Sequence, residues 1–388
     1  MTIPDPVTLS QALIRCPSVT PQDAGALAVL EAALTQLGFA CHRLRFEEAG
    51  TAPVENLYAR IGTQGPNFCF AGHSDVVPPG DAKLWRHDPF GAAIENGVLY
   101  GRGAADMKSA IACFISAAAR YLASGKPYGS ISLLITGDEE GISINGTAKM
   151  LGWLTQQGER LDHCVVGEPT STARAGDTIK IGRRGSMNTR LVVRGTQGHV
   201  AYPQNASNPL PAIAALVSRL SSDVLDKGTD HFDPSTLVFT TIDTGNQATN
   251  VIPAETKAGF NIRFNDLHTP DALKARIAAI AGAVGKESGC EIEIVHQVSG
   301  VAFLTRPGSF TELLAKAAEK VTGSRPQFST TGGTSDARFI KGHCPVAELG
   351  LSNATMHKAD ECASLADIGL LTDIYAQAID TYFANPPR

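Results

Sequence analysis

The sequence predicts an α/β protein: a doubly wound mixed sheet, interrupted by a smaller inserted domain of ferredoxin-like type. Short apolar segments alternate with helical segments before residue 180. Several of these apolar segments end in histidine or carboxylate residues, as expected where strand ends face a ligand crevice. Near residue 180 the order becomes strand, helix, strand, strand, helix, strand, which is the βαββαβ order of a ferredoxin-like module.

Length and composition favour a two-domain globular protein. A chain of 388 residues exceeds one ordinary core, and 43% hydrophobic with 18% charged residues is typical of soluble proteins. The net charge of -5 argues against nucleic acid or an acidic membrane as the main partner. We find no apolar run of membrane-spanning length and no basic, apolar secretory signal at the N-terminus, so we expect a cytoplasmic protein.

The cysteine pattern supports the same compartment. No two cysteines form a CxxC pair, and several lie within apolar segments, so reduced, buried thiols are expected rather than a disulfide framework. The eight cysteines are Cys16, Cys41, Cys69, Cys113, Cys164, Cys290, Cys344 and Cys362.

The first domain is expected to span residues 1–179 and to resume at 296–388. Before residue 180 we expect helices over 6–16, 21–38 and 108–124, and strands over 55–62, 67–72, 131–135 and 161–167. Pro21 favours a helix start and Gly38 a helix end. After residue 296 we expect a helix over 308–322, a loop over 328–338, a strand over 345–349 and a helix over 365–384.

The inserted domain is expected to span residues 180–295. Its predicted strands cover 180–194, 236–243, 256–264 and 290–296, and its helices cover 208–221 and 270–284. Both helices begin at a proline, Pro209 after Asn208 and Pro270 after Thr269, which is a strong N-terminal signal.

An acidic turn follows the apolar strand at 131–135. The strand breaks at Gly137 and delivers Asp138, Glu139 and Glu140 in a row. Adjacent carboxylates at the end of a buried strand repel one another unless a cation lies nearby. A solvated acidic turn is the alternative. If the turn aims Glu139 and Glu140 apart, one can bind a metal while the other moves protons.

Other chemistry-bearing residues also follow predicted strands or open a helix. His73 and Asp75 come after the strand at 67–72 and share a face, so the carboxylate could hold a ring nitrogen of the histidine. An ordinary strand end is the alternative. Gly101 and Gly103 precede Asp106 at a helix start, where a phosphate cradle is conceivable, but the acid would repel phosphate and the Walker spacing is absent.

Five side chains form a candidate ligand set. They are His73, Asp106, Glu140, Glu168 and His357. Two histidines and three carboxylates suit Zn2+, with Co2+ or Mn2+ as possible substitutes. Five ligands suit two ions if one carboxylate bridges, and Glu139 is then left as a general base.

The motifs around these residues resemble the di-zinc aminoacylase and carboxypeptidase superfamily over nearly the whole chain. The matching segments are His73-Ser74-Asp75, 101–108 (Gly-Arg-Gly-Ala-Ala-Asp-Met-Lys), Asp138-Glu139-Glu140-Gly141, Gly167-Glu168-Pro169-Thr170 and 353–358 (Asn-Ala-Thr-Met-His-Lys). The departures are Ser74, Ser109-Ala110 and Ala359-Asp360, and none removes a ligand.

The resemblance implies a role for each of these residues. Asp106 would bridge two Zn2+ ions per subunit, with a cis peptide bond after it at Asp106-Met107. His73 and Glu168 would complete one ion, and Glu140 and His357 the other. Asp75 would orient His73, and Glu139 would be the general base.

The resemblance also implies a homodimer formed through the inserted domain. In that scheme His199, in Gly198-His199-Val200-Ala201-Tyr202-Pro203, reaches the partner subunit's active site and stabilises a tetrahedral oxyanion.

The implied substrate is a small N-acyl diamino-dicarboxylate. Its carboxylates would need guanidinium groups, which bind carboxylate bidentately. Arg263 is the first candidate because it interrupts an apolar strand, and a surface ion pair is the alternative for each arginine. The full candidate set is Arg183, Arg184, Arg263, Arg338, Asn250, Tyr202, Thr334 and Asn353.

These observations predict a zinc-dependent amide hydrolase. Nearby alternatives are a related N-acyl-amino-acid deacylase, of the acetylornithine deacetylase type, and a dipeptidase of the same superfamily. A non-catalytic metal- or peptide-binding module is an alternative of another class, disfavoured because binding alone needs no acid such as Glu139 beside the ligands. A nucleotide-binding enzyme is a further alternative.

Overall fold

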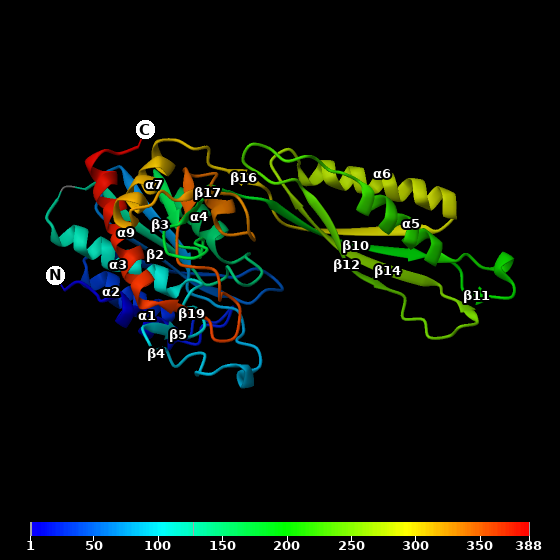
Figure 1. The fold of residues 1–388 in the computed structure, drawn as a ribbon, viewed down its shortest axis with the longest axis horizontal. Helices are drawn as coiled ribbons and strands as arrows, with labels where there is room; N and C mark the ends of the chain where they lie inside the picture. Colours follow the sequence, from blue (N-terminus) through cyan, green and yellow to red (C-terminus); the bar gives the residue numbers. More distant parts are fainter. Residues whose placement is uncertain (1, 127, 388) are drawn as a thin grey trace. The chain divides into compact units, whose positions relative to one another are not determined.

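The computed structural model describes residues 2–126 and 128–387, which form two compact units (Figure 1). Unit 1 comprises Met1–Ile181, Thr305–Ser329 and Ser335–Arg388, and unit 2 comprises Gly182–Leu304 and Thr330–Thr334. The expected insertion at 180–295 ends earlier than unit 2, because the last strand of that unit continues to Gly300 and a further short strand pairs back to its start.

Unit 1 is built on a mixed sheet of eight strands, in agreement with the predicted mixed α/β class. The strand order is β1-β2-β6-β3-β7-β18-β8-β17. The strands are β1 (Ala40–Phe46), β2 (Val54–Ile61), β3 (Asn67–His73), β6 (Ser130–Thr136), β7 (His163–Val166), β8 (Thr178–Lys180), β17 (Gln327–Ser329) and β18 (Val346–Glu348). β3 runs parallel to both β6 and β7, whereas β1, β2 and β6 are joined antiparallel.

Helices cover this sheet. They are α1 (Pro6–Ile14), α2 (Ala26–Gln36), α3 (Lys108–Ala123), α4 (Thr147–Gln156), α7 (Ser309–Thr322), α8 (Ala337–Ile340) and α9 (Leu365–Ala384). Every residue of β3 and β6 is buried, as expected for central strands covered on both faces. α3 packs against α1 and α9, and α9 also packs against α7 (Figure 1).

A small antiparallel sheet lies beside the main one in unit 1. It joins β4 (Ala93–Glu95), β5 (Val98–Tyr100) and β19 (Cys362–Ser364), with Cys362 opposite Tyr100. This pairing brings the loop before α3 next to the loop before α9, although more than 250 residues separate them.

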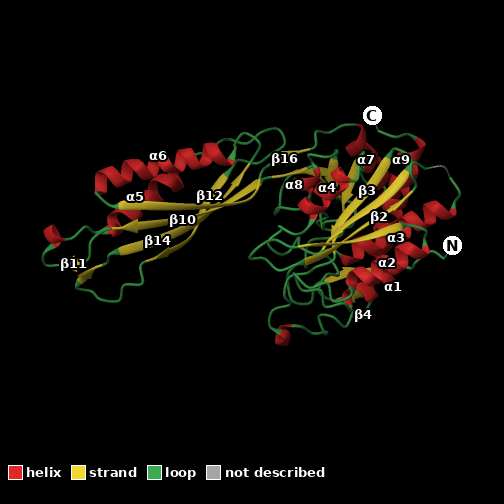
Figure 2. Cartoon of the chain, turned by 180° about the vertical axis from the view of Figure 1, so that it is seen from behind, coloured by secondary structure: helices red, strands yellow, loops and turns green. Residues whose placement is uncertain are grey.

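Unit 2 is a four-stranded antiparallel sheet with two helices on one face (Figure 2). In chain order its elements are β10 (Gly185–Arg194), α5 (Pro209–Ser222), β12 (Thr236–Asp243), β14 (Glu255–Phe264), α6 (Pro270–Ser288) and β15 (Glu291–Gly300). The strand order β12-β14-β10-β15 and the βαββαβ succession are those of a ferredoxin-like module. Its own apolar core includes Leu191, Leu216, Phe260 and Ile277.

Short pairs of strands complete unit 2. β9 (Gly182–Arg183) pairs with β16 (Phe303–Leu304), and β11 (Gly198–His199) pairs with β13 (Val251–Ile252). The described part of the chain also contains two 3-10 helices, Ala82–Leu84 in unit 1 and Pro203–Asn205 in unit 2.

Several expected elements differ from those observed. The helix expected over 21–38 begins only at Ala26, because the Asp23 carboxylate accepts hydrogen bonds from the backbone of Gly25 and Leu27 and so ends the preceding turn. Neither β1 nor α4 was predicted from the sequence. β1 is an edge strand of mixed polar and apolar residues, none of them buried, and α4 contains Gly152, which weakens its helical pattern.

Among the described residues, no helix of unit 1 or unit 2 is both long and apolar enough to cross a membrane.

Candidate metal centre

Four of the candidate side chains lie at or just after the ends of three neighbouring strands of unit 1. His73 is the last residue of β3, Glu139 and Glu140 follow β6, and Glu168 follows β7. Because β6 and β7 both run parallel to β3 on either side of it, their carboxyl ends lie at one edge of the sheet. The pattern of polar strand ends in the sequence therefore corresponds to one place in the structure.

Two loops complete the set. Asp106 lies just before α3, and the Asp106–Met107 peptide bond is cis, as the resemblance implied. His357 lies between β18 and β19, with a positive φ of 62°. The pairing of β5 with β19 brings these two loops together.

The first cluster consists of His73, Asp106 and Glu168. Their ligand atoms lie within 4.8 Å of one another, and all three side chains are buried. His73 Nε2 lies 3.1 Å from Asp106 Oδ1 and 3.8 Å from Glu168 Oε1.

The second cluster consists of Asp106, Glu140 and His357, again within 4.8 Å of one another. His357 Nε2 lies 2.9 Å from Glu140 Oε1 and 3.2 Å from Asp106 Oδ2. Asp106 thus presents one carboxylate oxygen to each cluster, which is the arrangement a bridging carboxylate requires.

The carboxylate of Asp75 holds the acidic turn. Its two oxygens accept hydrogen bonds from the backbone N–H groups of Glu139 (3.3 Å) and Glu140 (3.0 Å). His73 Nδ1 lies 2.9 Å from the main-chain carbonyl oxygen of Asp75 and 3.7 Å from its Oδ1. Asp75 therefore orients His73 through its carbonyl oxygen, while its side chain fixes the two glutamates.

The ionisable side chains of the centre shift one another's pKa values. Burial raises the pKa of Glu139 well above its usual range, and the charges of Glu168 and Asp336 raise it further. Hydrogen bonds from His357 to Asp106 and Glu140 raise the pKa of that histidine to about 10. Burial disfavours the charged form of His73, but its contacts with Asp106 and the nearby carboxylates raise its pKa overall.

This donor set fits two divalent cations. Two imidazoles and three carboxylates converge within coordination range of two points, and the carboxyl groups of Asp75, Glu139 and Asp336 lie around them. The buried carboxylates outnumber the histidines, so cations would stabilise the ionised carboxylates. Nitrogen and oxygen donors of this kind suit Zn2+, Mn2+ or Co2+.

Three supporting residues were not assigned roles from the sequence. Asp138 Oδ2 accepts hydrogen bonds from the backbone of Ile144 and Asn145, both at 2.9 Å, and so shapes the loop after the acidic turn. Asp336 is buried and accepts a hydrogen bond from Thr147 Oγ1 at 2.6 Å. Glu361 is buried beside Asp106. Asp336 and Glu361 receive these partners from distant parts of the chain, so no local motif marks them.

Of the remaining candidates, three belong to one end of unit 2. His199 lies on β11, and its Nδ1 accepts a hydrogen bond from Ala201 N at 3.0 Å. Its ring centroid lies 5.9 Å from that of Tyr202, whose side chain is exposed. The carbonyl oxygen of Asn250 accepts a hydrogen bond from Val200 N.

Three candidate arginines also belong to unit 2. Arg183 is buried, and its Nη1 donates to Thr331 O at 3.3 Å. Gly332 has a φ of 108°, at which other residues are strained, and a Cβ atom added there would lie 2.3 Å from that nitrogen. Burial lowers the pKa of Arg263, and the charge of Arg184 lowers it further. Among the described residues, Arg184 Nε is buried without a hydrogen-bond partner.

The last three candidates are divided between the units. Thr334 belongs to unit 2, not to the domain in which the sequence placed it. Arg338, on α8 of unit 1, is 3.9 Å from Asp336 Oδ1 and packs over the Phe339 ring. Asn353 is anchored by its backbone N–H to Ser171 O at 2.9 Å.

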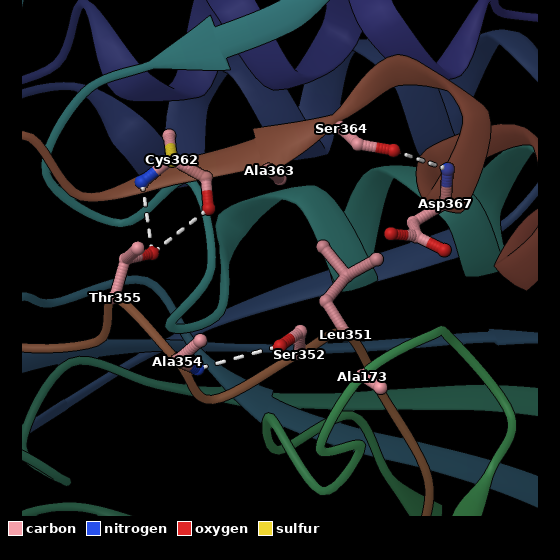
Figure 3. Close-up of a pocket in the computed structure, with 9 residues that line it drawn as sticks. All are labelled: Ala173, Leu351, Ser352, Ala354, Thr355, Cys362, Ala363, Ser364 and Asp367. Carbon is pink, nitrogen blue, oxygen red and sulfur yellow. Dashed lines mark hydrogen bonds between the residues drawn. The ribbon is translucent and has the colours of Figure 1, made fainter.

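A small pocket is lined by residues that precede and follow the segment carrying His357, and none of them is a candidate ligand (Figure 3). Its lining residues are Ala173, Leu351, Ser352, Ala354, Thr355, Cys362, Ala363, Ser364 and Asp367. Across it, Thr355 Oγ1 accepts a hydrogen bond from Cys362 N and donates one to Cys362 O.

Comparison with known proteins identifies relatives over nearly the full length of the chain. The model of peptidase family M20/M25/M40 matches residues 69–381. A succinyl-diaminopimelate desuccinylase of Rhodospirillum centenum is 57% identical over 383 residues, covering 98% of each chain. One of Parvibaculum lavamentivorans is 58% identical over 381 residues, covering 98% of this chain and 96% of the relative.

Solved structures share the fold at much lower identity. The aminopeptidase PepT of Bacillus cereus has a TM-score of 0.80 at 20% identity, covering 97% of each chain. A dinuclear metal-binding peptidase of the M20 family from Bacillus subtilis has a TM-score of 0.71 at 14% identity, covering 98% of each chain. At these identities the likeness concerns the fold alone.

Proposed function

The chain belongs to peptidase family M20/M25/M40, and we propose that it hydrolyses N-succinyl-LL-2,6-diaminopimelate to succinate and LL-2,6-diaminopimelate. This reaction belongs to diaminopimelate and lysine biosynthesis. The relatives that are more than half identical over nearly the whole chain bear the name of this activity, and an amide hydrolase agrees with the centre in unit 1.

One observation carries the chemistry: two ligand clusters share Asp106, and Glu139 stands beside them outside both. We propose that the clusters bind two Zn2+ ions per subunit, with Co2+ or Mn2+ as substitutes. When bound, two such ions acidify a water molecule and polarise a substrate carbonyl. His73 and Glu168 would hold one ion, Glu140 and His357 the other, and Asp106 both.

Glu139 is then the proton carrier. Its carboxylate takes a proton from water, whose oxygen attacks the amide carbonyl carbon. When the C–N bond breaks, Glu139 returns the proton to the leaving nitrogen. Its backbone N–H is held by Asp75 Oδ1, and burial favours the protonated form that this second step requires. His199 of the partner subunit would stabilise the oxyanion.

The arginines of unit 2 supply the recognition of substrate carboxylates. Arg184 and Arg263 lie near enough for one to lower the pKa of the other, and an anion between guanidinium groups would relieve that repulsion. Arg183, Arg338, Asn250, Tyr202, Thr334 and Asn353 are proposed as further substrate contacts.

We also propose a homodimer formed through unit 2 and a cytoplasmic location. The sheet of unit 2 exposes large apolar side chains on β12 and β15, namely Val238, Ile242 and Val295, each more than half exposed. All eight cysteines are free thiols, which suits a reducing compartment.

A substrate assay with metal analysis tests the function. The purified protein, loaded with zinc, is incubated separately with N-succinyl-LL-diaminopimelate, N-acetylornithine and simple dipeptides. We expect turnover of the first that exceeds turnover of the others, with two zinc ions per chain. Preference for acetylornithine or a dipeptide would establish the alternative deacylase or dipeptidase. Absence of any amide hydrolysis by the zinc-loaded protein would leave only a binding module.

A further inference from the structure

Glu361 is a fully buried carboxylate that belongs to neither ligand cluster. Its Oε1 accepts hydrogen bonds from three backbone N–H groups of the loop that ends in the shared ligand. The donors are Gly103 at 3.1 Å, Ala105 at 3.0 Å and Asp106 at 3.0 Å. One oxygen atom of the His357 loop thereby fixes the path of the Asp106 backbone.

The other oxygen of Glu361 binds a buried guanidinium group. Arg102 Nη1 donates to Glu361 Oε2 at 2.6 Å and to the carbonyl oxygen of Lys358 at 3.2 Å. The Arg102 guanidinium also lies over the Trp85 ring, 5.1 Å from its centroid. The main chain adds a bond from Gly101 N to Glu361 O at 2.9 Å. The two loops are thus joined by side-chain and main-chain hydrogen bonds, all donated by the loop before α3.

The segment that carries His357 needs such support because its backbone is strained. His357 and Asp360 have φ angles of 62° and 55°, in the left-handed region that disfavours residues other than glycine. Residues in such conformations persist only where the surroundings determine them. Thr355 closes the base of the segment through its two hydrogen bonds with Cys362, at 3.0 and 3.1 Å (Figure 3).

The two clusters depend on this joint to different degrees. His73 and Glu168 follow adjacent parallel strands, so the sheet itself fixes their separation. His357 is on a loop, and its Nε2 lies 3.2 Å from Asp106 Oδ2. This distance depends on the hydrogen bonds by which Glu361 joins the two loops. A change at Glu361 should therefore move His357 relative to Asp106 more than it moves His73 or Glu168.

We propose that Glu361 is a positioning residue that sets the affinity of the metal position formed by Asp106, Glu140 and His357. This inference rests on the proposed two-metal function. Groups that hold metal ligands from outside the coordination sphere commonly change metal affinity about 10–100-fold when removed.

The test is zinc titration of the metal-free protein by calorimetry, for the wild type and three variants. Glu361→Gln keeps the shape but places an amide NH2 against a donor, and Thr355→Val removes the hydroxyl that closes the segment. Glu159→Gln is the matched control, since it breaks a partly buried ion pair with Arg60 elsewhere in unit 1.

We expect Glu361→Gln to lower the affinity for one of the two zinc ions about 10–100-fold, while the affinity for the other ion changes less. At limiting zinc its kcat should fall, and excess zinc should restore kcat with KM unchanged. Thr355→Val should lower the affinity for the same ion by a smaller factor. Glu159→Gln should bind both ions with the affinities of the wild type.

The inference would be overturned if Glu361→Gln bound both zinc ions with unchanged affinity, or if its affinity for both ions fell by the same factor. If Glu361→Gln does not fold, Thr355→Val decides in its place by the same two criteria. A wild-type protein that binds only one zinc ion would instead refute the two-metal function, so the two failures are distinguishable.

Discussion

At the residue scale, the adjacent carboxylates Glu139 and Glu140 have different surroundings. Glu140 lies 2.9 Å from His357 within the second cluster, whereas Glu139 stands outside both clusters, close to the charges of Glu168 and Asp336. The Asp75 carboxylate separates them by accepting both of their backbone N–H groups. The proposed mechanism depends on this division, with Glu140 as a metal ligand and Glu139 as the proton carrier.

Replacing Glu139 should remove catalysis without removing metal. Glu139→Gln keeps the size of the side chain but cannot take a proton, so we expect kcat to fall by about 10²–10⁴-fold. Steady-state kinetics and elemental analysis of the same preparation check this. Near-normal turnover with both metals present would contradict the role of Glu139 as base.

Replacing Asp75 should disturb the turn itself. In Asp75→Asn an amide NH2 faces one of the two backbone N–H groups, so we expect about 10–100-fold weaker metal binding and a lower kcat. Asp177→Asn is the matched control, because Asp177 likewise accepts backbone hydrogen bonds, from Thr172, Ala173 and Arg174, away from the centre. Equal behaviour of the two variants would show that Asp75 has no special role.

At the element scale, the carboxylate of Asp226 helps to tie the loop between α5 and β12 to the turn after β14. Asp226 accepts hydrogen bonds from Gly228 N at 2.6 Å, Asn265 Nδ2 at 2.7 Å and His268 Nε2 at 2.9 Å, and from Ser235 N. Burial opposes its ionised form, but these donors lower the pKa of Asp226 to about 2.

The sign of the pH dependence follows from that shift. An Asp in the unfolded chain titrates near about 3.9, so the contribution of Asp226 is fully present above that pH and is lost as the pH falls towards 2. We expect Asp226→Asn to have a lower Tm than the wild type at pH 7. The difference between the two Tm values should be smaller at pH 3. Calorimetric Tm values at both pH values check this, and a constant gap would contradict it.

At the scale of the whole molecule, each unit has an apolar core of its own, and each holds part of the proposed chemistry. Unit 1 carries every candidate metal ligand and Glu139, and unit 2 carries His199 and three of the candidate arginines. In the proposed homodimer the two groups of residues would act together, because His199 would act in the partner subunit's site.

Mixed dimers test that arrangement. Glu139→Ala and His199→Ala should each be nearly inactive alone. In a mixed dimer one site would combine an intact Glu139 with an intact His199 of the partner subunit. After equimolar unfolding and refolding together, half the dimers are mixed with one working site each, so activity should reach about a quarter of wild type. No recovery, with mixed dimers shown by mass spectrometry, would refute the cross-subunit role.

Much of the fold was predictable because it depends on local patterns. β12 and α9 have the predicted bounds, and the βαββαβ order of unit 2 follows from its proline helix starts and apolar strands. β1 and α4 were missed because an exposed edge strand and a glycine-containing helix owe their form to packing, not to periodicity. The boundary near residue 300 was placed too early because β15 ends in partly polar, exposed residues.

The sequence by itself determined the chemical types at the centre. Polar residues after buried parallel strands must meet at one sheet edge, so His73, Glu140 and Glu168 could be grouped without coordinates. Only the tertiary structure decided that Asp106 offers one oxygen to each cluster, that the Asp75 carboxylate holds the acidic turn, and that Glu361 joins two loops. These contacts depend on ångström-scale distances between residues up to 259 positions apart, which no local pattern encodes.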